Sequence, residues 1–238
     1  MVSSGEQTNT LAEDTEPLSR WERRTGKRVF EASQNQLLER SRQIVEAAYE
    51  LLKEGGLDGL TIRAVLQRTG LSRRAFYERF AGKDDLMLAV FEETICAATR
   101  HYAEQVEKIA DPKERLKLIV TSIVIGKRAS ARQKEEKSDR RGAAMSREHM
   151  RLAESRPEEL QEVLRPLISL IARLLSDAMA AGEVRRTDPE RLAKLVYNLV
   201  STTAHTELLT QHSDNPDVEG RYKLAEDVWE FCLHAISA

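Results

Sequence analysis

Hydrophobic residues recur with helical spacing from Leu38 onward. In the first such segment, one face is formed by positions that follow the i, i+3, i+4, i+7, i+8 rule: Ile44, Ala47, Ala48, Leu51 and Leu52. Gly55 and Gly56 follow this stripe and are typical of a helix end. The pattern predicts an amphipathic helix that packs one side into a core.

Two short helices are predicted after it, separated by a tight turn. Thr61 is placed to cap the first, which turns Ile62, Val65 and Leu66 inward. Gly70 suits the left-handed position of a turn, and Ser72 is placed to cap a second short helix over Arg73–Arg79. This arrangement is that of a helix-turn-helix.

The rest of the chain has the same helical character. A long helix is expected from Lys83, and further starts are marked by Asp111-Pro112, by the capping-box spacing of Ser155 and Glu158, and by Asp188-Pro189. The last helix has Leu224, Val228, Phe231, Cys232 and Ala235 on its predicted inner stripe. No alternating strand pattern or Asn-Gly hairpin signal occurs, so the predicted fold class is all-α.

The amino-terminal segment has a different composition. Residues 1–18 are rich in Ser, Thr and Glu without an apolar period, which predicts a disordered tail. The basic run Arg20–Arg28 fits either an arm that contacts a polyanion or a solvated linker. We therefore expect a tail with a basic arm over 1–35, a helix-turn-helix domain over 36–82 and a second helical domain over 83–238.

Net charge at first argues against nucleic acid as a partner. The 238 residues contain 37 Lys and Arg against 39 Asp and Glu, a net charge of −2, whereas binding to phosphates calls for excess positive charge. The charge is unevenly distributed, however. Arg20 to Lys83 holds 14 basic and 8 acidic residues, which leaves +6 there and −8 elsewhere. The positive segment contains the helix-turn-helix, and this favours DNA binding.

The second short helix is predicted to expose Arg73, Arg74 and Tyr77 on the side away from Leu66 and Phe76. An arginine fork can pair with guanine edges in the major groove or with phosphate oxygens. Four further residues are predicted phosphate contacts because they are helix caps, start a helix or carry an exposed charge: Thr61, Arg63, Ser72 and Lys83.

The segment from Thr61 to Leu86 resembles the TetR family of transcriptional regulators. The resemblance rests on Gly70, Leu71, Ser72 and the run Tyr77-x-x-Phe80-x-x-Lys83-x-x-Leu86. It implies a homeodomain-like three-helix DNA-binding domain followed by an α-helical ligand-binding and dimerisation domain. It further implies a homodimeric regulator that binds palindromic operator DNA and responds to a small-molecule effector. We expect a repressor that the effector releases from DNA, and an activator or dual regulator of the same architecture is the alternative within DNA binding. Residues of the last two helices are the predicted dimer interface: Leu195, Leu199, Val228 and Cys232.

Candidates for effector contact are polar or soft side chains on otherwise apolar helical faces: Tyr102, Met145, Met150, Tyr197 and His205. Because only 5% of residues are aromatic, we expect an aliphatic, acyl-like effector. The five histidines form no metal-type motif, and Cys96 and Cys232 are predicted core thiols rather than a disulfide or a metal pair. No cofactor or metal is expected.

Leu66 and Glu78 depart from the family pattern and leave an alternative open. In it, the chain is a helical small-molecule-binding or scaffold protein whose helix-turn-helix no longer binds DNA. No catalytic motif is present, so we expect no enzyme activity. The apolar stretch Leu118–Ile125 is too short to span a membrane, and no basic residue precedes Arg20, so we expect a cytoplasmic protein with no membrane partner.

Overall fold

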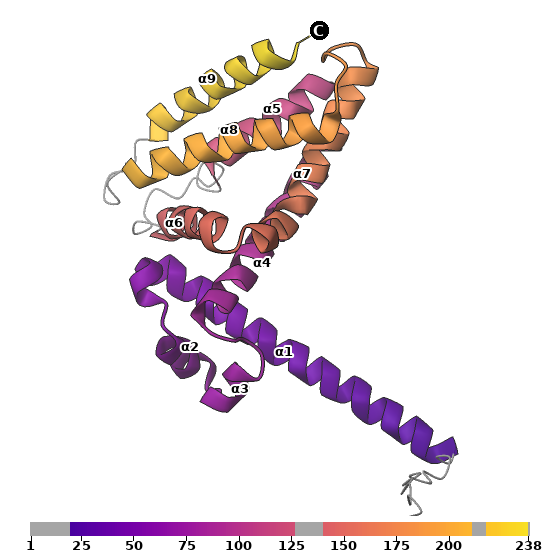
Figure 1. The fold of residues 1–238 in the computed structure, drawn as a ribbon, viewed down its shortest axis with the longest axis vertical. Coiled ribbons are helices and arrows are strands. Elements are labelled where there is room, and N and C mark those ends of the chain that lie inside the picture. Colours follow the sequence, from indigo (N-terminus) through magenta and orange to yellow (C-terminus); the bar gives the residue numbers. More distant parts are fainter. Residues whose placement is uncertain (1–19, 127–139, 211–217, 238) are drawn as a thin grey trace, which may run out of the picture. The chain divides into compact units, whose positions relative to one another are not determined.

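A computed structural model describes residues 20–126, 140–210 and 218–237 and shows nine α-helices within these ranges (Figure 1). In chain order they are α1 (Arg20–Gly59), α2 (Ile62–Thr69), α3 (Arg73–Tyr77), α4 (Lys83–Val106), α5 (Pro112–Ile125), α6 (Arg140–Ser155), α7 (Pro157–Ala180), α8 (Pro189–Thr210) and α9 (Val218–Ile236). Extended pairing in the described ranges amounts to one isolated bridge between Val184 and Ser237. The all-α prediction is confirmed.

The first helix is longer than its hydrophobic stripe predicted. It begins at Arg20 instead of near Leu38, so the basic run Arg20–Arg28 is helical. Arg, Lys and Glu are good helix formers, and the run needs no apolar face to continue a helix that is packed further along. The chain divides into two units, Met1–Arg42 and Gln43–Ala238, and the second contains the helix-turn-helix and all the later helices. The predicted tail over 1–18 lies outside the described residues.

One hydrophobic core holds the short helices together. Ile44, Ala48 and Leu52 of α1 are fully buried in it, with Phe76 of α3 and Val90 of α4. The α1 helix is broken at Gly56, where φ is 63° and ψ is −156°. Only glycine adopts this backbone conformation without steric cost, so the predicted end of the apolar stripe coincides with a real change of direction.

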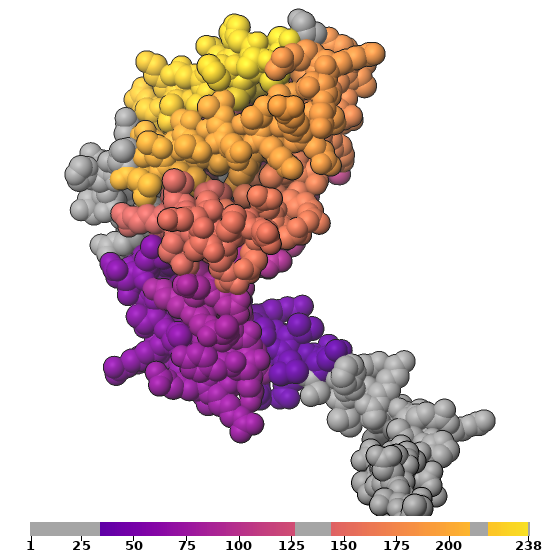
Figure 2. Space-filling model, viewed as in Figure 1, coloured from indigo at the N-terminus to yellow at the C-terminus, as the bar shows by residue number. Residues whose placement is uncertain are grey.

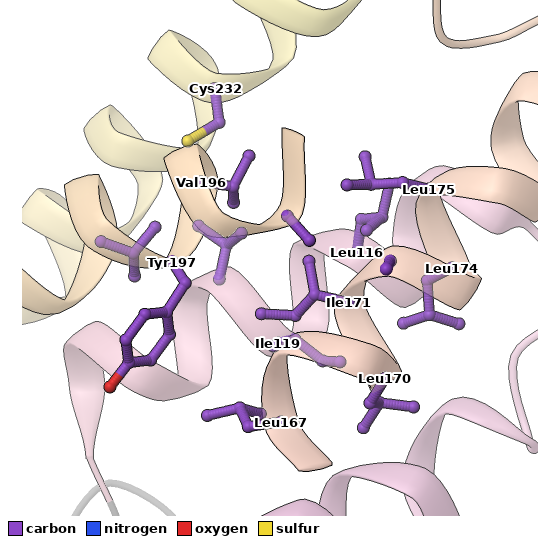
Figure 3. Close-up of a cluster of buried hydrophobic side chains, with 14 of the residues drawn as sticks. Leu116, Ile119, Leu167, Leu170, Ile171, Leu174, Leu175, Val196, Tyr197 and Cys232 are labelled. Atoms are coloured by element: carbon purple, nitrogen blue, oxygen red, sulfur yellow. The ribbon is translucent and has the colours of Figure 1, made fainter. Parts of the chain in front are cut away.

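A second core fills the space between α5, α7, α8 and α9. It contains Leu116 and Ile119 of α5, a row of aliphatic residues from Leu167 to Leu175 of α7, and Cys232 of α9 (Figure 3). Most of its buried side chains are aliphatic, and Phe91, Tyr197 and Trp229 are its buried aromatic members. This composition follows from the leucine-rich sequence of α7, which buries residues at helical spacing on one wide face.

The α4 helix takes part in both cores. Its Val90 is buried in the first and the adjacent Phe91 in the second. The α6 helix also reaches both, since Ala144 is buried in the first core and Leu152 in the second. The space-filling view shows the surface of α6 directly against that of the first turns of α4 (Figure 2). These two helices therefore connect the helix-turn-helix to the carboxy-terminal helices.

Two local predictions in this region are corrected by the structure. Ser155 does not cap α7: it ends α6, and its hydroxyl donates to the carbonyl of Arg151 at 2.8 Å. The residue before α7 is Arg156, which makes no side-chain cap, and the helix starts on Pro157 instead. Phe231, predicted on the inner stripe of α9, is 64% exposed.

Candidate DNA interface and effector region

The helix-turn-helix is held by the caps that the sequence indicates. The Thr61 hydroxyl accepts from the Ala64 amide at 3.1 Å, and the Ser72 hydroxyl accepts from the Ala75 amide at 3.2 Å. Gly70 has φ 67° and ends α2 in the left-handed conformation. Arg68 of α2 forms a two-pronged bond to Glu54 of α1, at 3.1 and 2.6 Å. The caps and the glycine turn thus define the ends of α2 and α3, and the Arg68–Glu54 pair joins α2 to α1.

The outward face of α3 carries the predicted base-reading residues. Arg73 is exposed and has no ion pair among the described residues, and Tyr77 is 51% exposed. The Tyr77 ring packs edge-on against buried Phe76, with the two ring centroids 5.3 Å apart. This contact holds the ring in place while half of the side chain remains exposed to solvent. Both side chains are free to approach a DNA groove.

Arg74 stands in a different situation from Arg73. Its side chain is 90% exposed, and its Nε donates to the Glu78 carboxylate at 2.8 Å. The guanidinium of Arg74 lowers the pKa of Glu78, mainly through this hydrogen bond. Glu78 therefore stays negative and holds Arg74 within the chain.

Lys83 and Arg63 occupy flanking positions. Arg63 is exposed on α2. The Lys83 ammonium donates to the Leu57 carbonyl at 3.2 Å, which ties the start of α4 to the end of α1. An ammonium has three donors, so two remain for a phosphate. Of the predicted DNA contacts, Arg74 and Lys83 are thus partly engaged within the chain.

The predicted effector contacts divide into interior and surface residues. Tyr102 and Tyr197 lie inside the carboxy-terminal helices, and burial raises the pKa of Tyr102 to about 12 and also raises that of Tyr197. Figure 3 shows the Tyr197 hydroxyl pointing away from the aliphatic cluster. Met145 is partly buried against both cores. Met150 is 52% exposed, so the structure places it on the surface of α6 and not among the interior candidates.

Interior polar residues gather on one path across three helices, which we call the polar seam. Its members are Tyr102 of α4, Ser146 and His149 of α6, and Tyr197, Ser201 and His205 of α8. The residues of α8 follow one another at intervals of four and share a helix face. His205 Nδ1 and the Ser146 hydroxyl are hydrogen-bonded at 3.0 Å, and the rings of His149 and His205 lie 4.5 Å apart.

Burial keeps both seam histidines uncharged at neutral pH. It lowers the pKa of His149, and together with the neighbouring His149 ring it lowers that of His205 to about 4. Sequence reasoning missed Ser146, His149 and Ser201. The signal that could have found them is the spacing of polar residues within apolar helical faces, at 146 and 149 and at 197, 201 and 205.

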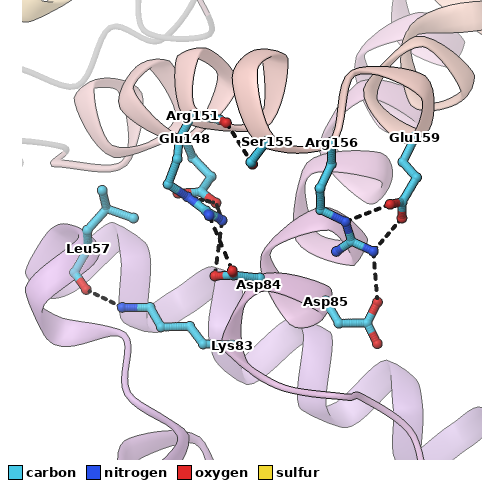
Figure 4. Close-up of polar contacts among 9 residues, drawn as sticks. All are labelled: Leu57, Lys83, Asp84, Asp85, Glu148, Arg151, Ser155, Arg156 and Glu159. Atoms are coloured by element: carbon cyan, nitrogen blue, oxygen red, sulfur yellow. Dashed lines mark hydrogen bonds and ion pairs between the residues drawn. The ribbon is translucent and has the colours of Figure 1, made fainter.

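A second group of charged residues joins α4 to α6 and α7 (Figure 4). Arg151 of α6 binds Glu148 through Nε at 3.0 and 3.1 Å and reaches Asp84 of α4 at 3.1 Å. Arg156 binds Glu159 at 2.7 Å and lies 3.9 Å from Asp85. The acidic pair at the start of α4 is therefore held by two arginines at the junction of α6 and α7, an arrangement we call the α4 latch. Sequence reasoning missed it.

The predicted interface residues differ in exposure: the two on α8 lie at the surface, and the two on α9 are buried. Leu195 and Leu199 of α8 are 59% and 38% exposed, whereas Val228 and Cys232 of α9 are buried in the core. The structure therefore places Val228 and Cys232 in the core and not on the outer face of α9. Phe231 is the large apolar residue that α9 presents outward.

Both thiols are shielded from deprotonation. Burial raises the pKa of Cys232 to about 11. The pKa of Cys96 is also raised, by burial and by the nearby carboxylates of Glu92 and Glu93. Neither residue forms a disulfide. Within the described ranges, no cluster of three His, Cys, Asp or Glu residues is placed to hold a metal, and no helix is long and apolar enough to cross a membrane.

Comparison with known proteins agrees with this architecture. Residues 44–90 match the family of bacterial regulatory proteins of the tetR type, and residues 138–235 match the carboxy-terminal domain of AefR-like transcriptional repressors. Together the two matches cover more than half of the chain. The first match spans the helix-turn-helix and the start of α4, and the second includes α6 to α9.

Individual relatives are distant in sequence. The fatty acid metabolism regulator protein of Bacillus subtilis is 21% identical over 169 residues, which is 69% of this chain and 81% of that protein. The crystal structure of the regulator FadR from Bacillus subtilis with stearoyl-CoA superimposes with a TM-score of 0.61 at 17% identity, covering 81% of this chain and 97% of the other. A TetR-family regulator from Pectobacterium atrosepticum gives 0.64 at 18% identity, covering 86% and 97%. With its capped helix-turn-helix and its matching carboxy-terminal helices, the chain belongs to the TetR family of transcriptional regulators.

Proposed function

We propose that this protein is a ligand-responsive repressor that binds a two-fold symmetric operator as a homodimer and leaves it when a small molecule binds the carboxy-terminal helices. The observation that carries the proposal is the outward face of α3, where Arg73 and Tyr77 stand exposed on a helix fixed by caps at Thr61 and Ser72. Such a face fits the major groove, and arginine reads guanine there.

Dimerisation is supported by the outer faces of α8 and α9. Leu195, Leu199 and Phe231 are large apolar residues left exposed there. A second copy of the chain would cover them and would set the spacing of the two recognition helices, which is about 34–36 Å for half-sites one turn apart. The apolar faces and the symmetry of such operators support the same assembly.

An aliphatic effector is supported by two observations. The carboxy-terminal core is built mainly from aliphatic side chains, most of them leucine, isoleucine, valine and alanine. The crystal structure of FadR from Bacillus subtilis, moreover, is of a complex with stearoyl-CoA. The relative found by sequence in the same organism is a fatty acid metabolism regulator protein. We therefore propose a molecule with an acyl chain as effector.

The α4 latch supports a route between the two sites. The α6 helix carries His149 of the polar seam and, half a turn on, Arg151 of the latch. A ligand that moves α6 also moves the partner of Asp84, and Asp84 lies in the first turn of α4 beside the helix-turn-helix. By linkage, operator DNA must then weaken effector binding by the same factor as the effector weakens DNA binding.

A gel shift with the DNA upstream of the protein's own gene tests DNA binding. We expect a shift at low salt that an unrelated duplex does not compete away. The variant Arg73→Ala should weaken binding to this DNA by about 5- to 150-fold if Arg73 reads a base, from a loss of about 1–3 kcal/mol. The absence of any shift at low salt would favour the alternative, a helical binding protein without DNA activity. A loss that is equal on all sequences would assign Arg73 to phosphate.

A further inference from the structure

The polar seam contains ring nitrogens that no group in the chain satisfies. His149 is 9% exposed, and its Nδ1 is buried without a hydrogen-bond partner. His205 uses Nδ1 for Ser146, and its Nε2 is likewise buried and unpartnered. A neutral imidazole has one donor nitrogen and one acceptor nitrogen. Burying either nitrogen inside a protein without a hydrogen bond costs free energy. Two such atoms on neighbouring rings indicate a ligand group that forms the missing hydrogen bonds.

The surroundings of the two rings extend the same feature along α4. Phe91 lies against His149, with ring centroids 5.5 Å apart, and the same face of α4 continues through Ile95 and Thr99 to Tyr102. Thr99 Oγ1 is a third buried oxygen or nitrogen without a partner. Tyr102 and Tyr197 are close enough for the charge of one to influence the other. A row of hydrogen-bonding groups thus borders an aliphatic core.

The seam carries no positive charge at neutral pH. Its members are hydroxyls and two imidazoles that burial keeps neutral. The charged groups beside it on α6, Glu148 and Arg151, are bonded to each other and to Asp84. A carboxylate placed at the seam would therefore lose its hydration without gaining a cation, which is costly in a protein interior. A carbonyl oxygen needs only a donor such as an imidazole N–H.

Resting on the ligand-responsive function proposed above, we propose that His149 and His205 bind the uncharged carbonyl of an acyl ester or thioester, whose aliphatic tail lies among the leucine and isoleucine side chains of α5 and α7. The protein then distinguishes an esterified acyl group from the free acid of the same length.

Three probes of one chain length separate these ligands: methyl dodecanoate, dodecanoyl-CoA and dodecanoate. Titration calorimetry on the full-length protein at neutral pH should give a dissociation constant at least about tenfold higher for dodecanoate than for the methyl ester. Tight binding of dodecanoyl-CoA as well identifies thioesters as a source of the carbonyl, and binding of the methyl ester without it identifies simple esters. Equal or tighter binding of dodecanoate would overturn the proposal, and so would the failure of all three to bind.

Paired substitutions test the two ring nitrogens separately. An Asn amide replaces Nδ1 and a Gln amide replaces Nε2 of a histidine. For His205, whose open atom is Nε2, His205→Asn should weaken methyl ester binding about tenfold while His205→Gln retains it. For His149, whose open atom is Nδ1, the order should reverse: His149→Gln weakens binding and His149→Asn retains it. A purely structural role would not produce this crossed pattern, and four variants with equal affinity would overturn the proposal.

His101, exposed on α4, supplies the matched control, and His101→Asn and His101→Gln should bind the ester as the unaltered protein does. Operator gel shifts without ligand, together with thermal melts, show whether each variant is folded. If operator DNA is bound but the crossed pattern is missing, only this inference fails. If operator DNA is not bound by the unaltered protein, the proposed function fails whatever the ligand results are.

Discussion

Arg73 and Arg74 are neighbours on α3, yet their electrostatic surroundings differ. Arg73 faces solvent without an ion pair among the described residues, while Arg74 is bonded to Glu78 one turn further along. An exposed pair of this kind adds little to stability. We expect its effect to be on recognition, because Arg74 would have to exchange the Glu78 carboxylate for a base edge or a phosphate in order to contact DNA, and Glu78 would then lie beside the DNA.

We expect Glu78→Gln to increase DNA affinity, because it removes a negative charge near the phosphates and releases Arg74. The gain should be about three- to tenfold at low salt and should shrink as salt rises. Fluorescence anisotropy with operator and unrelated duplexes measures it. Glu50→Gln, which removes an exposed carboxylate on α1, is the control and should leave affinity nearly unchanged. Unchanged affinity in Glu78→Gln would mean that Arg74 takes no part in DNA binding.

His205 makes stability dependent on pH. Its pKa is about 4 in the folded protein, against a usual value of 6.5, so between these values the unfolded chain binds the proton more readily. The contribution of neutral His205 to the stability of the folded protein is therefore complete above pH 6.5, and it is lost as the pH falls toward 4. Between pH 6.5 and 5 the free energy of unfolding should fall by about 2 kcal/mol from this group.

Thermal melts at these two pH values should show a decrease in Tm of about 4–8 °C from His205 alone. His149, whose pKa is lowered in the same direction, adds to the effect. In His205→Gln the decrease should be smaller by that amount, since a Gln amide does not titrate. An equal decrease in the variant would show that other groups control acid stability.

The sequence pattern did not predict the α6 helix, although this helix contributes several residues to the proposed site. It carries Ser146 and His149 of the polar seam and Arg151 of the α4 latch. Hydrophobic spacing did not reveal it, because its buried apolar residues are few and include small Ala144. The helix-turn-helix, by contrast, was predictable in detail. Its caps at Thr61 and Ser72 and its turn at Gly70 depend on residues close in sequence.

Contacts between distant helices were beyond sequence reasoning for a related physical reason. The bond between Arg151 and Asp84 joins residues 67 positions apart, and no local pattern marks it. Likewise, the stripe on α9 predicted Phe231 as buried together with Cys232, but neighbouring helices decide which part of a wide apolar stripe is covered. Effector and interface residues depend on such packing, and only part of their predicted sets lies where expected.

In the α4 latch, the two partners of Arg151 should differ in their effect on stability. Glu148 has a side chain only 5% exposed, so Arg151→Ala leaves a buried carboxylate without its partner. Because Arg151 itself is 40% exposed and solvent weakens the interaction, we expect the free energy of unfolding to fall by only about 2–3 kcal/mol. Asp84 is 64% exposed, and Asp84→Asn should cost less than about 1 kcal/mol.

Urea denaturation monitored by circular dichroism measures both losses. Adding Glu148→Gln to Arg151→Ala should recover part of the stability, because the buried negative charge is then absent. Equal losses for Arg151→Ala and Asp84→Asn would contradict the account, since they would mean that Glu148 is adequately hydrated without Arg151.

At the scale of the whole molecule, positive charge is concentrated in the part of the chain that contains the helix-turn-helix. Arg20 to Lys83 has a balance of +6 and the remaining residues a balance of −8. The acidic remainder repels phosphate, so DNA is attracted to one part of the protein only. The near-neutral total therefore does not conflict with DNA binding.

Assembly should depend on the exposed apolar residues of α8 and α9. Leu195→Asp and Phe231→Asp place a charge on the faces proposed to meet a second copy, and each should convert the dimer into a monomer of 27.0 kDa. Light scattering coupled to gel filtration measures the mass. Met150→Asp alters an equally exposed apolar residue of α6 and should remain dimeric. A persistent dimer in both α8 and α9 variants would place the interface elsewhere.

The two native cysteines have a practical consequence. Cys232 is buried with a pKa near 11, and the pKa of Cys96 is raised as well, so neither forms a reactive thiolate readily at neutral pH. A single cysteine introduced at exposed Tyr77 would therefore be the thiol that reacts first with a spin-label reagent, with both natural cysteines left in place. In a symmetric dimer, one such label per chain reports a single distance. Pulsed electron resonance could follow the separation of the two recognition helices directly as an acyl compound is added.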